Sequence, residues 1–240
     1  MHKETLTGGN MDPVIKVGDT VRRVTGPWTA AVHELLGLYA AAGIEAAPHA
    51  LGLDDRGREI LTYIEGETLE AAPPEVRWRA SILRGSAGLL RELHDASAPL
   101  AARGLTWRNE THDPAEVICH NDFAPYNLIV QGGRLAGVID FDMASPGSRI
   151  WDFAYLAYRL APYAEDAAGF DPTTHGTSDD RLDTLITAYG TDFPPPAVRR
   201  TITERLTALA AFSDNRATQT NNPDLHTHAA MYRRDATRLR

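Results

Sequence analysis

HNDFAPYN at residues 120–127 and IDFD at residues 139–142 are the two stretches that decide the fold of this chain. The first places Asp122 at the end of a short apolar strand, with Asn127 five positions later, and a second hairpin then delivers Asp140. Asn127 and Asp140 offer hard oxygen ligands that suit Mg²⁺. Asp122 can orient a hydroxyl and accept its proton. Phosphoryl transfer requires this combination, because the phosphate charge must be neutralised and the nucleophile held in place.

Several segments together resemble the aminoglycoside phosphotransferase-like kinases, a superfamily that includes choline kinases and is related to the protein kinases. PGSRIWDFA at residues 146–154 is similar to the family's segment after the metal-binding Asp, and LRELH at residues 90–94 is similar to its leucine-rich helix. Residues 61–66 look like its interlobe hinge. The resemblance implies an α+β, protein-kinase-like fold with a small β-rich lobe and a larger, mainly helical lobe. It also implies a kinase that uses ATP and Mg²⁺ to phosphorylate a small-molecule hydroxyl.

The resemblance also implies roles for individual residues. Asp122 is the catalytic carboxylate that faces the acceptor hydroxyl, and Asn127 and Asp140 hold Mg²⁺ against the nucleotide phosphates. Supporting roles are implied for three more residues: His120 packs the catalytic loop, Asp142 is a candidate for a second metal ion, and Asp152 opens a helix and braces the loop.

The nucleotide is expected to bind in the first lobe. The resemblance implies that Thr62, Tyr63 and Ile64 supply main-chain hydrogen bonds to adenine. It further implies that Gly8 and Gly9 let the backbone approach the triphosphate, because glycine adopts dihedral angles that other residues avoid. ATP is the expected nucleotide, and GTP is the alternative.

The sequence departs from the family at the phosphate-binding lysine. The strand after the first hairpin turn reads TVRRV at residues 20–24 and contains no lysine. Arg22 or Arg23 can take its place, since a guanidinium also binds phosphate, although its geometry differs from that of an ammonium group. Side chains alternate along a strand, so only one arginine can face the cleft, and we expect Arg22. The carboxylate partner of this arginine is left open.

The chain divides into two parts at about residue 66. Residues 1–66 are predicted to form a hairpin, a helix over 28–42 and two further strands, which together make the nucleotide-binding lobe. Residues 67–240 are predicted to form the catalytic and acceptor-binding lobe, with a long helix over 76–94 and mainly helices beyond residue 151. A cleft between two such lobes is a common ligand site.

Composition excludes several classes of protein. The chain has 240 residues with 24 Lys+Arg and 32 Asp+Glu, a formal net charge of −8, which argues against sequence-independent binding of nucleic acid. No apolar run approaches the roughly 20 residues of a membrane span, and the N-terminus lacks the apolar core of a signal peptide. Cys119 is the single cysteine, so no internal disulfide is possible. These features favour a cytoplasmic protein with a small-molecule partner, and they leave the oligomeric state open.

The acceptor is not identified by these motifs, since a fold does not determine its substrate. Both an antibiotic and a metabolite are compatible with the pattern. An aminoglycoside acceptor predicts carboxylates that line the pocket of the helical lobe and bind its amines. The candidates are Glu165, Asp166, Asp171, Asp179 and Asp180.

Three other interpretations stay open. A nucleotide-binding module with impaired catalysis is favoured by the missing lysine and opposed by the intact Asp122, Asn127 and Asp140. A zinc hydrolase that begins with H-x-D would need further histidine ligands, and His226 and His228 lie in a polar segment. A protein–protein scaffold would show no effect of Mg²⁺ and nucleotide on its stability.

Overall fold

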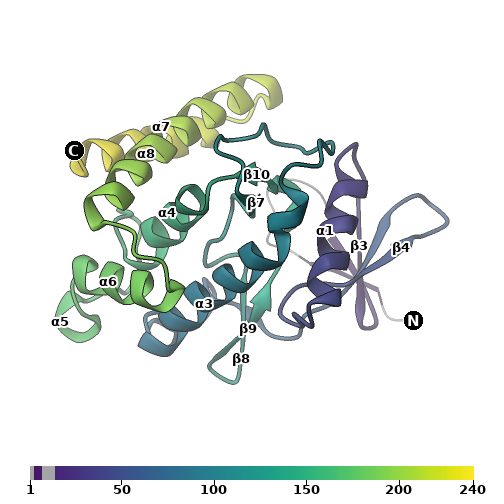
Figure 1. The fold of residues 1–240 in the computed structure, drawn as a ribbon, viewed down its shortest axis with the longest axis horizontal. Coiled ribbons are helices and arrows are strands. Elements are labelled where there is room, and N and C mark those ends of the chain that lie inside the picture. Colours follow the sequence, from purple (N-terminus) through teal and green to yellow (C-terminus); the bar gives the residue numbers. More distant parts are fainter. Residues whose placement is uncertain (1–2, 7–13) are drawn as a thin grey trace.

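The computed structural model describes residues 3–6 and 14–240. Figure 1 shows a small sheet with one helix at the N-terminal end and a larger, mainly helical part beyond it. The predicted α+β, two-lobed fold is confirmed. Gly8 and Gly9, the predicted phosphate-binding turn, lie outside the described residues.

The N-terminal sheet has five strands in the order β1-β2-β3-β5-β4, and every neighbouring pair is antiparallel. Gly18, at φ +59°, makes the tight turn between β2 and β3, a backbone angle that glycine adopts without strain. Val21 lies opposite Leu61 in the register, and both are buried. The bounds are β1 (Lys3–Leu6), β2 (Val14–Val17), β3 (Thr20–Arg23), β4 (Ala50–Leu53) and β5 (Glu59–Thr62).

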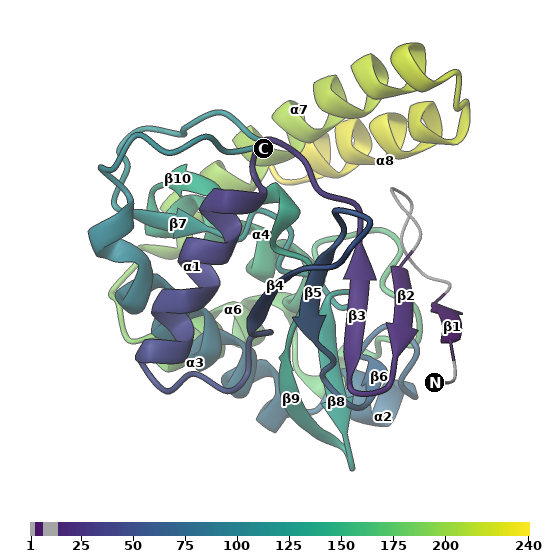
Figure 2. The same cartoon turned by 90° about the vertical axis from the view of Figure 1, so that its right-hand side faces the viewer.

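Helix α1 (Thr29–Ala41) lies between the sheet and the helical lobe (Figure 2). Its apolar residues recur at helical spacing and are buried, as the sequence predicts, and Gly43 follows its end at φ +75°. The Tyr39 ring lies 5.7 Å from that of Phe141, which follows Asp140. Helix α1 therefore packs against the segment that carries the predicted metal ligand.

The long helix predicted over 76–94 is in fact two helices, α2 (Pro74–Arg77) and α3 (Ala80–Ser97). Arg79 is extended (ψ 136°), which separates them. Trp78 explains the break, because its buried indole donates to the carbonyl of Ala168 and anchors the junction. The 3-10 turn η1 (Ala98–Leu100) follows α3.

Two small sheets flank residues 120–127 and 139–142. Strand β7 (Val117–Cys119) pairs with β10 (Ser145–Gly147), and β8 (Leu128–Gln131) pairs with both β6 (Glu67–Thr68) and β9 (Arg134–Val138). The pairing of β7 with β10 places the residues that follow β7 beside the residues that precede β10. The short turn η2 (Phe141–Met143) lies between β9 and β10.

The remaining chain is helical, as predicted. It consists of α4 (Arg149–Leu160), α5 (Pro172–His175), α6 (Ser178–Tyr189), α7 (Pro195–Thr220) and α8 (Asp224–Arg238). Helices α7 and α8 form an antiparallel hairpin whose far end projects from the body of the molecule (Figure 2). No helix in the described part of the chain is both long and apolar enough to cross a membrane.

Candidate active site

Asp122 lies on the loop that follows β7, and both of its carboxylate oxygens are hydrogen-bonded. The Tyr126 hydroxyl donates to Oδ1 at 2.5 Å, and the Asn127 side-chain amide donates to Oδ2 at 2.9 Å. The amide of Asn127 also donates to the main-chain oxygen of Asp122 at 2.9 Å. Burial raises the pKa of the Asp122 carboxyl, and the bond from Tyr126 acts in the opposite direction. The carboxylate is therefore held in one orientation by two neighbours.

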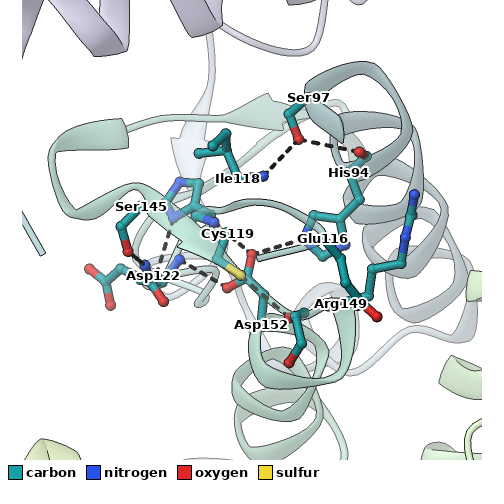
Figure 3. Close-up of polar contacts among 12 residues, drawn as sticks. His94, Ser97, Glu116, Ile118, Cys119, Asp122, Ser145, Arg149 and Asp152 are labelled. Atoms are coloured by element: carbon teal, nitrogen blue, oxygen red, sulfur yellow. Dashed lines mark hydrogen bonds and ion pairs between the residues drawn. The ribbon is translucent and has the colours of Figure 1, made fainter. Parts of the chain in front are cut away.

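Asp152 holds the start of this loop in place (Figure 3). Its carboxylate accepts hydrogen bonds from the main-chain N–H of His120 at 2.6 Å and of Asn121 at 2.9 Å. His94 Nε2 lies 3.1 Å from the same carboxylate. Burial alone would raise the pKa of Asp152, but the hydrogen bond and charge of His94 hold it below its usual value. Asp152 lies in the first turn of α4, where a negative charge also favours the helix dipole.

His120 packs under the loop. Its Nδ1 accepts from the main-chain N–H of Asp122 at 3.2 Å, and its Nε2 donates to the carbonyl of Ile139 at 3.0 Å. Its ring lies against the rings of Phe123 and Phe141. Both ring nitrogens are thus occupied, which argues against the zinc interpretation of this histidine.

A second group of metal-ligand types lies beside it, since donor atoms of His94, Cys119 and Asp152 are within 4.8 Å of one another. Each atom is already engaged: Cys119 donates to the carbonyl of Ser148, and His94 Nδ1 lies 2.8 Å from the Tyr189 hydroxyl. Burial raises the pKa of the Cys119 thiol, which disfavours the thiolate that a metal requires. The group acts as a hydrogen-bonded brace.

Asn127 and Asp140 meet beside Asp122. The main-chain N–H of Ile139 donates to the carbonyl of Asn127 at 2.9 Å, which ties the two segments together. Asp140 has a left-handed backbone (φ +67°), and its side chain is 41% exposed. Since the amide nitrogen of Asn127 is used by Asp122, its Oδ1 and the Asp140 carboxylate are the oxygens that a hard cation such as Mg²⁺ would take.

Arg23, and not Arg22, faces this site. Its Nη2 lies 3.0 Å from Asp140 Oδ1 and 2.7 Å from Asp142 Oδ2. Arg22 instead donates to the Thr20 hydroxyl at 2.7 Å and lies 3.9 Å from Asp54. The two arginine side chains point to opposite faces of β3, as predicted. The one that points toward Asp140 is Arg23, whereas we expected Arg22.

The carboxylate partner of Arg23 is Glu59 on β5. The two residues are directly opposite in the antiparallel register, with Nε 3.5 Å from Oε1. On α1, His33 Nε2 lies 3.1 Å from the other Glu59 oxygen, whereas Glu34 pairs with Arg103. Burial raises the pKa of Glu59, and the Arg23 charge opposes this shift.

Asp142 lies on the far side of Arg23. Arg108 Nη1 is 3.4 Å from its carboxylate, and the Arg108 guanidinium lies 4.4 Å from the centre of the Trp28 ring. Burial raises the pKa of Asp142, while the charges of Arg23 and Arg108 lower it. Two arginines thus already neutralise this carboxylate.

Thr62, which ends β5, and the following Tyr63 and Ile64 are the residues predicted to bind adenine. The main-chain N–H of Thr62 donates to the carbonyl of His49 at 3.0 Å, and that of Tyr63 donates to Asp19 at 2.9 Å. These two amides are occupied within the N-terminal lobe, because the sheet continues through this segment. Ile64 follows where the chain crosses to β6.

Sequence reasoning missed Arg205 on α7. It donates to both the side-chain and the main-chain oxygen of Asn121. Its guanidinium lies 5.0 Å from the Trp151 ring centre and 4.8 Å from that of Tyr155. No motif on α7 marks this residue, whose partner is far away in the sequence.

Comparison with known proteins agrees with this geometry. Residues 100–198 match the model of the "Phosphotransferase enzyme family". The trifolitoxin immunity protein of Rhizobium leguminosarum bv. trifolii is 35% identical over 196 residues, which cover 77% of this chain and 73% of that protein.

Two solved structures share the fold. An ethanolamine kinase of Plasmodium vivax has a TM-score of 0.73 at 14% identity, covering 98% of this chain and 82% of that one. A streptomycin–ATP complex of an aminoglycoside phosphotransferase has a TM-score of 0.57 at 18% identity, covering 97% and 93%. The chain therefore belongs to the aminoglycoside phosphotransferase-like family of phosphotransferase enzymes.

Proposed function

We propose that this chain is a kinase that transfers the γ-phosphoryl group of ATP to a hydroxyl of a small molecule. Family membership supports the class of small-molecule phosphotransferase. The observation that carries the finer proposal is the convergence of Asp122, Asn127, Asp140 and Arg23 on one site. ATP as the donor also points to the cytoplasm as the place of reaction.

Mg²⁺ fits the oxygens of Asn127 and Asp140, and when bound it would neutralise charge on the phosphates. Arg23 stands where the family has a lysine and provides a fixed cation beside them. A guanidinium can bind phosphate through two parallel N–H groups, so Arg23 is suited to this task. Glu59 and His33 hold it in position.

Asp122 would receive the acceptor hydroxyl at Oδ1, which the Tyr126 hydroxyl contacts in this structure. It takes the hydroxyl proton while the acceptor oxygen bonds to the γ-phosphorus and the bond from phosphorus to the bridging oxygen breaks. A raised pKa makes Asp122 a better proton acceptor near neutral pH. Asn127 keeps the carboxylate aligned through Oδ2.

The two lobes have different roles in this proposal. Residues 1–66 bind the nucleotide, with Gly8, Gly9 and Ile64 as proposed contacts, and residues 67–240 carry catalysis and the acceptor. The 35% identical relative is named a trifolitoxin immunity protein, and by analogy we propose a role for this chain in protection against a toxin.

Melting experiments test the proposal. The full chain is heated with Mg²⁺ plus ATP or GTP, with Mg²⁺ alone, and with nucleotide in EDTA. A ligand at about 100 times its Kd stabilises by about 2.7 kcal/mol, which raises the melting temperature by several degrees. We expect a shift that needs both Mg²⁺ and nucleotide, and its absence would contradict the proposal.

A nucleotide-binding module with impaired catalysis is the second candidate. The close contact of Arg23 with Asp140 favours it, because the arginine competes with a cation for that carboxylate. Slow hydrolysis of ATP, measured as phosphate release, separates the two. Binding without any turnover would favour the module.

A further inference from the structure

The acceptor side of Asp122 is built from tyrosines. The Tyr126 hydroxyl, bonded to Asp122, lies 3.0 Å from the Tyr155 hydroxyl. Tyr232 on α8 interacts with Tyr155 in turn. The Tyr126 hydroxyl occupies Asp122 Oδ1, the atom proposed to receive the acceptor hydroxyl, so the groups around these three tyrosines lie close to any bound acceptor.

Arginines already lie beside these aromatic residues. The guanidinium of Arg205 is 4.8 Å from the centre of the Tyr155 ring, and that of Arg159 is 5.7 Å from the centre of the Tyr158 ring. An ammonium group that bound to the same tyrosines would lie close to a guanidinium, and like charges repel strongly where water is excluded. The aromatic row is therefore a poor receptor for a cationic acceptor.

The carboxylates that could receive amines are paired with arginines of the chain. Glu165 binds Arg234 with an Nε–Oε2 distance of 3.1 Å, and Arg159 lies 3.0 Å from Asp166. Arg199 lies 2.6 Å from Asp179, and its hydrogen bond lowers the pKa of that carboxyl.

The other two predicted carboxylates stabilise helix ends. Asp171 accepts from the main chain and hydroxyl of Thr173 at the start of α5. Asp180 bonds Thr177 in the capping box of α6. All five carboxylates predicted for an aminoglycoside therefore already hold an arginine or a helix end, so an amine would share them with these groups.

A cavity of about 240 Å³ adjoins the catalytic loop. Pro125, the neighbour of Tyr126, forms part of its wall, and the charged residues of the wall are Arg77, Arg159, Glu70 and Asp166, the last of which is paired with Arg159. The Arg159 side chain is only 11% exposed, and its Nε has no hydrogen-bond partner among the described residues. This buried N–H can donate a hydrogen bond to an oxygen of a ligand, whereas the guanidinium charge repels an ammonium group.

The hairpin formed by α7 and α8 carries the same preference. Residues 195–240 contain eight arginines and four carboxylates, although the whole chain has a net charge of −8. The segment that contributes Arg205 and Tyr232 is thus basic within an acidic protein, which favours neutral or negative ligands.

From these contacts we propose that the acceptor is an uncharged or anionic hydroxyl compound, without amino groups near the hydroxyl that is phosphorylated. The inference rests on the proposed kinase function and names the substrate class of the same site. Arg159 and Arg205 are the residues that discriminate against cations.

Acceptors that share their hydroxyl groups and differ in charge test this inference, and the choline pair also matches in shape. Kanamycin is compared with its fully N-acetylated derivative, and choline with its uncharged carbon isostere, each with the full chain, Mg²⁺ and ATP. The readouts are the change in melting temperature and the transfer of label from the γ-phosphate of ATP. We expect the uncharged member of each pair to give the larger response. An equal response, including none from either member, or a larger response to the amine would overturn the proposal.

A charge variant gives a second measurement. Arg159→Gln removes the cation and releases Asp166, so the affinity ratio of uncharged to charged acceptor should fall by about tenfold. Arg200→Gln is the matched control, because Arg200 is 69% exposed on α7 and lies outside this site. An unchanged ratio in Arg159→Gln would contradict the role of Arg159. Absence of a response to Mg²⁺ and ATP in the wild-type chain would instead show that the kinase proposal itself fails.

Discussion

At the scale of single residues, Asp122 is the proposed general base of the reaction. We expect Asp122→Asn to keep the melting shift with Mg²⁺ and nucleotide, because the substituted side chain is not a proposed ligand. Turnover should fall by about 10²–10⁴, the usual contribution of a general base. Phosphate release from ATP, with water in place of the acceptor, measures the effect. Turnover at the wild-type rate would remove Asp122 from the mechanism.

Asp152 carries a prediction about pH. Its pKa is lowered in the fold, so ionised Asp152 stabilises the protein above the usual carboxyl pKa near 4, and this stabilisation is lost as the pH falls below that value. Asp152→Asn removes the buried negative charge beside His94, and it places an amide against main-chain N–H donors. We expect a loss of about 3–5 kcal/mol at pH 7.

Urea unfolding at several pH values checks this expectation. The difference in unfolding free energy between wild type and Asp152→Asn should be constant above about pH 5 and shrink at lower pH. A difference that grows on acidification would show that the sign is wrong.

Several single residues were predictable because their signals are local. Asp122, Asn127 and Asp140 follow from spacings within one loop and one hairpin. Which of the two arginines on β3 points toward Asp140 could not be predicted in the same way. The face of a strand that points to the interior depends on what packs against each face. Arg205 gave no signal at all, because its contact with Asn121 joins two distant segments.

At the scale of elements, the pairing of β3 with β5 builds the proposed nucleotide site. The register places Glu59 opposite Arg23 and so supplies the carboxylate partner that the sequence left open. Both strands were predicted, and aligning them as an antiparallel pair would have shown this contact. Glu34, the one carboxylate of the helix predicted over 28–42, pairs with Arg103 instead.

Arg23 and Arg22 form a matched pair of variants on β3. We expect Arg23→Ala to weaken binding of Mg²⁺ and ATP by about tenfold or more, since a charged hydrogen bond contributes about 1.5–3 kcal/mol. Arg22→Ala removes the same group from a neighbouring position that faces Asp54, so it should bind nucleotide like wild type. Calorimetric titration gives both affinities. The reverse order would restore Arg22 as the phosphate-binding residue.

The helical elements were predicted less evenly. The long apolar run of α3 was found, but the break at Trp78 was not, because it depends on the contact of that indole with Ala168 far along the chain. Strand β10 was also missed, since SPG at residues 145–147 has no strand-like composition and is held only by its pairing with β7.

At the scale of the whole molecule, the two lobes share one core. A single cluster of buried side chains includes Val21 and Leu35 from the first lobe and Leu90 and Phe153 from the second. The carbonyl of Ala46, in the loop between α1 and β4, accepts from the main-chain N–H of Val138 on β9 at 2.8 Å. A side chain at position 137 would collide with that carbonyl, so glycine is required there.

This continuity predicts that the lobes unfold together. Arg23 with Asp140 and Trp28 with Arg108 add an ion pair and a cation–π contact across the same boundary, and both would be lost if the lobes separated. Urea transitions followed by tryptophan fluorescence and by circular dichroism should therefore coincide, as expected for a single cooperative unit. Phe substitution of the other three tryptophans leaves Trp28 as a probe of the first lobe, and its midpoint should match that of the whole chain. An earlier midpoint for Trp28 would mean that the nucleotide lobe opens on its own, and that Mg²⁺ and ATP stabilise the protein by ordering that lobe.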